Sequence, residues 1–100
     1  MEITSAQNPR IKHLLALQQK SSLRREERLF VVEGRRELEH CIHAGMQVES
    51  IYHLPSVNSQ LSTFNSQLIS VTPNVYERTA YRGSTEGIIA VIRTPQPRSL

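Results

Sequence analysis

The sequence contains no aspartate, and Cys41 is its single cysteine. Without aspartate, the acid that most often orients a nucleophile–histidine pair is missing, although a glutamate could take that place. One cysteine excludes an intrachain disulfide. This usage fits a reducing compartment, so we expect a cytoplasmic protein.

Long apolar runs are also missing. No stretch approaches the roughly 20 residues that are needed to cross a membrane, and residues 1–5 lack the basic and apolar regions of a signal peptide. We therefore expect no membrane partner. A chain of 100 residues is long enough for one domain, whose folding buries roughly two thirds of the surface of the unfolded chain.

The motifs of common enzyme classes are not found. The chain has no glycine-rich dinucleotide or phosphate loop and no G-x-S-x-G nucleophile turn. His40, Cys41 and His43 suggest a metal site, but Cys41 falls on an apolar helical period and no fourth ligand is near in sequence. The few aromatic residues are scattered, so no platform for stacking unpaired bases is visible. We expect no catalytic, cofactor-binding or metal-binding residue in this chain.

Positive charge is present and unevenly distributed. The net charge is +3, and residues 1–36 hold eight of the twelve cations but only four of the nine acids. A concentrated basic patch attracts phosphate backbones. The alternative is a solvated face whose arginines pair with neighbouring glutamates. The eight cations are Arg10, Lys12, Lys20, Arg24, Arg25, Arg28, Arg35 and Arg36.

Hydrophobic periodicity predicts the helices. Asn8 and Pro9 form a helix start, and apolar residues recur at helical spacing to about Lys20. Residues 23–28 are polar and predict a turn or a short helix. Residues 34–44 repeat the helical period, with Gly45 as a left-handed residue after the helix end. Further helices are predicted at 73–80 and, less regularly, at 57–63.

Strands are predicted at 29–33, 48–54, 68–71 and 87–93. The last of these, β-branched and continuous, should lie inside the sheet. Strands alternating with helices favour a three-layer α/β/α sandwich around a small, mixed, four-stranded sheet. We place the domain at residues 1–93. The two prolines in residues 94–100 predict the start of a linker.

The segment from Arg28 to Arg36 is the most informative in the chain. Leu29 to Val32 form an apolar run typical of a fully buried strand, which Glu33 closes and Gly34 separates from a helix. Ligands bind at the carboxyl ends of strands in open α/β sheets. We therefore expect one carboxylate and several arginines to meet at one edge of the sheet, facing a polyanion. Glu33 would brace an arginine there.

Three segments of the chain together resemble the N-terminal substrate-binding domain of SpoU-type (TrmH-family) RNA 2′-O-ribose methyltransferases. The first is Ile3-Thr-Ser-Ala-Gln-Asn-Pro-Arg-Ile-Lys12, the second is Arg28-x-Phe-Val-Val-Glu-Gly-x-Arg36, and the third is Gly87-Ile-Ile-Ala-Val91. The resemblance spans about residues 3–93. It implies a four-stranded fold like that of ribosomal kink-turn-binding proteins and binding of ribosomal or transfer RNA.

The resemblance also implies a second, knotted C-terminal domain that follows the linker. That domain would bind S-adenosylmethionine, transfer the methyl group and form a homodimer, so this chain would be inactive alone. Two other hypotheses remain open from the residues: a free-standing RNA-binding module of ribosomal type, and a protein-interaction domain whose basic face is incidental. A polar loop at Ser84–Gly87 could contact phosphate or form an ordinary turn.

The candidate RNA-binding residues come from two sources. Those carried over from the family resemblance are Arg10, Lys12, Arg28, Glu33 and Gly34. Those added from charge alone are Arg24, Arg25, Arg35 and Arg36.

Overall fold

The computed structural model describes residues 2–57, 68–80 and 87–95. In these ranges the strands are β1 (Glu2–Ile3), β2 (Leu29–Glu33), β3 (Val48–His53), β4 (Leu68–Val71) and β5 (Ile88–Arg93). The helices are α1 (Pro9–Gln19), α2 (Ser21–Glu27), α3 (Arg35–His43) and α4 (Pro73–Thr79). Helices and strands thus follow one another as the periodicity predicts.

The strands form one mixed sheet in the order β1-β4-β3-β5-β2. β1, β4 and β3 pair in parallel, whereas β5 pairs antiparallel with both β3 and β2. β2 therefore runs in the same direction as β3, and β5 alone runs the opposite way. The carboxyl ends of four strands lie at one edge of the sheet.

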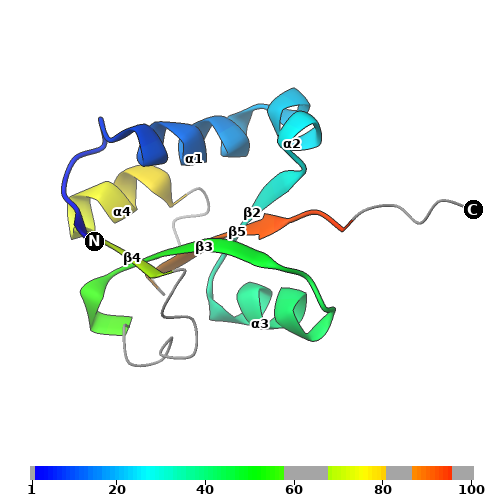
Figure 1. The fold of residues 1–100 in the computed structure, drawn as a ribbon. Helices are drawn as coiled ribbons and strands as arrows, with labels where there is room; N and C mark the ends of the chain where they lie inside the picture. Colours follow the sequence, from blue (N-terminus) through cyan, green and yellow to red (C-terminus); the bar gives the residue numbers. More distant parts are fainter. Residues whose placement is uncertain (1, 58–67, 81–86, 96–100) are drawn as a thin grey trace, which may run out of the picture.

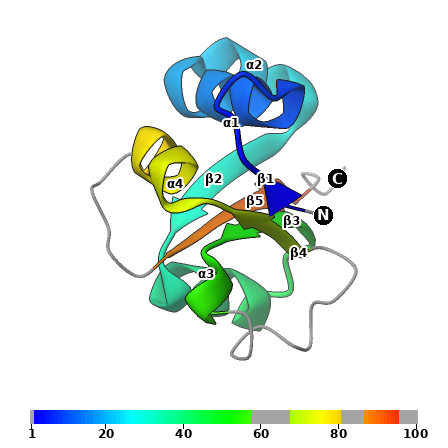
Figure 2. The same ribbon diagram turned by 90° about the vertical axis from the view of Figure 1, so that its left-hand side faces the viewer.

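Helices cover both faces of the sheet (Figures 1 and 2). On one face, α1 and α4 enclose a core that includes Ile11, Leu14 and Tyr76. On the other face, α3 places Leu38 and Cys41 against the sheet. The three-layer α/β/α architecture is confirmed. β5, whose residues 88–92 are all buried, lies inside the sheet as predicted.

Two expectations about the sheet are wrong. The sheet has five strands in the described residues, not four, because Glu2 and Ile3 pair with β4; a strand of two residues is too short to show a period. Leu29 to Val32 do not form a fully buried strand, because β2 is an edge strand. Leu29 is buried, but the next four residues of β2 are half-buried.

The predicted helix over 57–63 lies, apart from Val57, outside the described residues.

Local signals set the helix boundaries. The side chain of Asn8 accepts a hydrogen bond of 2.9 Å from the backbone N–H of Arg10, and Pro9 opens α1. After α3, Gly45 has φ +81° and donates to the carbonyl of Ile42, while Met46 donates to that of Cys41. This pair of bonds is the Schellman arrangement, which needs a left-handed residue and so favours glycine. The prediction for Gly45 is confirmed. Of the two alternatives predicted for residues 23–28, the structure shows the short helix, as part of α2.

We predict that Asn8→Ala lowers the free energy of unfolding by about 1 kcal/mol, because the first turn of α1 loses its side-chain acceptor. Urea titration followed by circular dichroism measures the change. Asn8→Ser is the control, since it retains an acceptor and should cost much less. Equal losses for the two variants would contradict the capping role.

We predict that Cys41 reacts slowly in the folded protein. Burial, and then the neighbouring Glu37 carboxylate, raise the pKa of this thiol above its ordinary value of 9.0. The folded chain thus holds the thiol proton more tightly than the unfolded chain does. The pH profile of alkylation by iodoacetamide should have a higher midpoint in the native protein than in urea. Coinciding midpoints would contradict the burial of the thiol.

Candidate nucleic-acid interface

The antiparallel ladder between β2 and β5 fixes both ends of the candidate interface. Its paired residues run from Leu29 with Arg93 to Glu33 with Ile89. The ladder continues past both ends of β2, since Thr94 N–H donates to the carbonyl of Arg28 (2.7 Å) and Gly34 N–H donates to that of Ile88 (2.9 Å). Arg28 and Gly34 therefore have fixed backbone positions at opposite ends of one strand.

An open groove lies at the amino-terminal end of β2. Its volume is about 370 Å³, and residues from α2, β2 and the end of β5 line it. We call it the Arg28 groove. Its lining residues are Ser21, Arg24, Arg25, Arg28, Leu29, Phe30, Thr94 and Pro95.

The cations of the Arg28 groove come from α2 and from the residue that ends it. Ser21, Arg24 and Arg25 stand at positions i, i+3 and i+4, which share one face of the helix, and Arg28 is the C-cap residue that follows. At 100° per residue, the intervening glutamates of α2 point away from this face. The lining of the groove accordingly contains three arginines and no carboxylate.

Arg24 is held by the end of α1. Its Nη1 donates to the backbone carbonyls of Leu17 (2.6 Å) and Gln18 (3.0 Å). These carbonyls belong to the last turn of the helix, where carbonyls lack a partner within the helix. Arg24 therefore joins α1 to α2, and its guanidinium has a set position at the border of the groove.

Arg28 adopts a conformation that normally favours glycine. With φ 59° and ψ 43° it is left-handed, and it is the sole non-glycine residue with positive φ in the described part of the chain. For a residue with a Cβ atom this conformation costs roughly 1–2 kcal/mol. Arg28 is half-buried.

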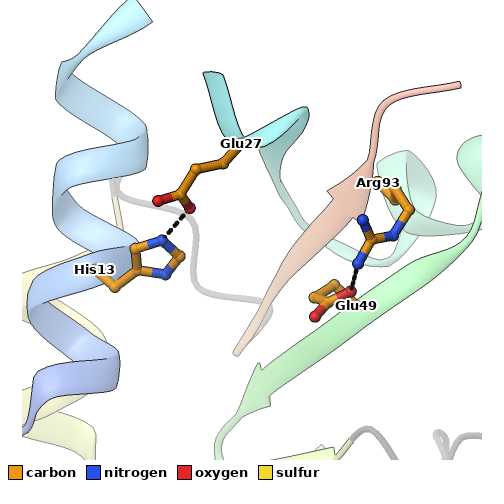
Figure 3. A network of polar contacts seen from close by, with 4 residues as sticks. All are labelled: His13, Glu27, Glu49 and Arg93. Atoms are coloured by element: carbon orange, nitrogen blue, oxygen red, sulfur yellow. Dashed lines mark hydrogen bonds and ion pairs between the residues drawn. The ribbon is translucent and has the colours of Figure 1, made fainter. Parts of the chain in front are cut away.

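One ion pair and one histidine–carboxylate contact, both exposed, lie near this end of the molecule (Figure 3). His13 Nε2 of α1 lies 2.5 Å from Glu27 Oε1 of α2, and Arg93 Nη2 of β5 donates to Glu49 Oε2 of β3 at 2.6 Å. Pairs as exposed as these contribute at most about 1 kcal/mol each. They matter here because they engage Glu27 and Glu49 away from the Arg28 groove.

The opposite end of β2 has a different charge balance. Gly34 has φ 94° and ψ 156°, a region open essentially to glycine alone, which gives this residue a backbone role. Arg35 Nε donates to Glu39 Oε1 at 2.9 Å, and Arg36 is exposed. We call residues 33–36 the Gly34 edge.

A second hollow runs along the outer side of β2. Glu33 and Glu37 line it together with Arg24, Gln18 and apolar residues of β2. Carboxylates here reduce the attraction of the Gly34 edge for an anion. That Glu33 braces an arginine remains a prediction.

The cations of α1 lie on different sides of that helix. Arg10 lines a third hollow, together with His13, Glu49 and residues of the sheet. Lys12 is exposed, and two helix positions place it about 200° around the axis from Arg10. The structure thus brings Arg24, Arg25 and Arg28 together but leaves Arg10 and Lys12 apart.

The expected convergence of the arginines at one edge of the sheet is wrong. At about 3.3 Å per residue, the five residues of β2 separate Arg28 from the Gly34 edge by about 16 Å. The sequence has arginines before and after β2, and the strand holds these two groups at its opposite ends. The RNA contacts of the individual candidate residues remain predictions.

Sequence reasoning missed Ser21, Phe30, Thr94 and Pro95 as parts of the groove. The i, i+3, i+4 spacing of Ser21 with Arg24 and Arg25 was a usable signal. No local signal reveals Thr94, because the β2–β5 register alone brings it to Arg28. The loop at 84–87 lies, except for Gly87, outside the described residues.

Within residues 2–57, 68–80 and 87–95 no three side chains of the metal-binding types gather at one place. Among the same residues no helix has the length and hydropathy of a membrane span.

A family model for the MRM3-like substrate-binding domain matches residues 8–90. A search of curated proteins finds no match. The family match covers more than half of the chain and includes every candidate residue from Arg10 to Arg36.

Solved structures give the same fold. The crystal structure of an RNA 2′-O ribose methyltransferase is 32% identical and superposes with a TM-score of 0.81, over 98% of this chain and 39% of that one. An rRNA methyltransferase from Sinorhizobium meliloti is 20% identical, with a TM-score of 0.79 over 97% and 38% of the two chains. The SpoU methyltransferase AviRb from Streptomyces viridochromogenes is 20% identical, with a TM-score of 0.70 over 88% and 34%.

The chain spans about two fifths of the length of the first structures it matches. The model match across residues 8–90, the five-stranded α/β/α fold and the 32% identity to one solved relative agree with one another. The chain belongs to the MRM3-like substrate-binding domain family.

Proposed function

We propose that this chain is the RNA-binding domain of an RNA 2′-O-ribose methyltransferase, and that it docks ribosomal or transfer RNA for a separate catalytic domain. The observation that carries the proposal is the family match over residues 8–90. The 32% identical relative, an RNA 2′-O ribose methyltransferase, supports the same enzyme class.

The charge distribution supports RNA as the ligand. The Arg28 groove offers guanidinium groups that can form two hydrogen bonds each with phosphate. We propose that the nine candidate residues contribute to the RNA site unequally. Gly34 acts through its backbone conformation, Arg24 through its set position and the exposed Arg25 through direct contact, whereas the exposed Arg36 contributes less.

We place methyl transfer outside residues 1–93. Two of the matched structures, those of the Sinorhizobium meliloti and Streptomyces viridochromogenes proteins, contain AdoMet. We propose that the same cofactor serves a catalytic domain attached through the proline-containing segment at 94–100. We extend the proposal to a cytoplasmic homodimer that forms through that catalytic domain.

We predict that the chain binds a transfer RNA transcript or a ribosomal RNA hairpin with strong salt dependence. Each phosphate that the protein neutralises releases counterions, so the log–log slope of affinity against salt should be about −0.7 to −0.9 per contact. Fluorescence anisotropy at 50 and 200 mM KCl measures this slope. Absent binding, or affinity independent of salt, would contradict the proposal.

We predict that the 100-residue chain transfers no methyl group from S-adenosylmethionine to these RNAs. Incorporation of tritium from labelled S-adenosylmethionine measures transfer, with a full-length 2′-O-methyltransferase as the positive control. Turnover by the chain itself would contradict the separation of RNA docking from chemistry.

A further inference from the structure

We infer that the Arg28 groove is the principal phosphate-binding site of this domain, and that it holds the RNA backbone where β5 leaves the sheet. This inference rests on the proposed RNA-binding function. It assigns the main contact to the end of β2 opposite the Gly34 edge.

The local charge favours phosphate binding in the Arg28 groove. Three arginines line the groove without a carboxylate, whereas each of the two other hollows described above contains at least one glutamate. On α2, Glu27 is engaged by His13 and lies off the face that the arginines share. At the Gly34 edge, Arg35 is paired with Glu39. A phosphate therefore meets stronger net attraction in the Arg28 groove.

The Arg28 groove is partly preorganised. Two carbonyls of α1 hold Arg24, and the hydrogen bond from Thr94 N–H fixes the backbone of Arg28. Glycine would adopt the left-handed conformation of residue 28 without strain, yet the residue here is an arginine, which supplies a guanidinium group. The Arg24 side chain, held in this way, and the fixed backbone of Arg28 both reduce the conformational freedom that is lost when a ligand binds.

The remaining residues that line the groove also suit an RNA backbone. Ser21 and Thr94 bring hydroxyl groups, which commonly bond phosphate and sugar oxygens. Phe30 and Pro95 bring apolar surface beside the cations. An anionic backbone with attached sugars fits this combination, because it presents both charge and apolar surface. Contacts of this kind carry little sequence information.

A matched pair of double variants tests the inference. Arg25→Gln with Arg28→Asn removes two charges from the groove, and asparagine tolerates the left-handed conformation of residue 28. Arg35→Gln with Arg36→Gln removes two charges from the Gly34 edge. The net charge of the two variants is equal, so long-range effects cancel in the comparison.

The groove variant should weaken binding about tenfold and reduce the salt slope by about two, equally for two RNAs of different sequence. The edge variant should change the dissociation constant less than threefold. Equal losses, or a larger loss at the edge, would overturn the inference while leaving RNA binding intact. Failure of the unmodified chain to bind RNA would instead overturn the proposed function.

Arg28→Gly separates binding from folding. Glycine suits the left-handed backbone, so the midpoint of thermal unfolding should stay equal or rise, while RNA affinity should fall. Unchanged affinity in this variant, with folding intact, would count against a role for the Arg28 guanidinium group.

Discussion

The pairing of β2 with β5 is the constraint on which the rest of the interface depends. In the strand order β2 lies outermost, next to β5. The ladder between them continues to Thr94 at one end and to Gly34 at the other, so the two arginine-bearing segments lie at opposite ends of β2. The buried strand β5 lies between β2 and β3 and fixes this register. The distribution of positive charge over the domain is therefore a consequence of strand order.

Helix packing converts part of that charge into a defined surface. α2 is short and contains no buried residue, so packing alone holds it weakly. Arg24 ties it to the carbonyls at the end of α1, and His13 pairs with Glu27. These links orient one face of α2 toward the start of β2. The hydrogen bonds of Arg24 to α1 thus help to position the exposed Arg25 on the same helix.

Much of the fold could be predicted from the sequence because its signals are local. The helix start at Asn8, the left-handed Gly45 and the β-branched run of β5 each act over a few residues, and all three match the structure. β1 could not be predicted, because two residues carry no period and owe their strand conformation to β4. The candidate site was harder still: the proximity of Thr94 to Arg28 depends on a ladder between segments more than 60 residues apart. The expectation that the arginines before and after β2 would meet was wrong, because the length of the strand separates them.

The most direct test of the account is an NMR titration of the ¹⁵N-labelled chain with a transfer RNA transcript, following backbone amides at both ends of β2. The account predicts the largest shifts or line broadening at Arg25, Arg28 and Thr94, with smaller changes at Arg35 and Arg36. Perturbation confined to residues 33–39, with the α2 and Thr94 signals unmoved, would contradict it.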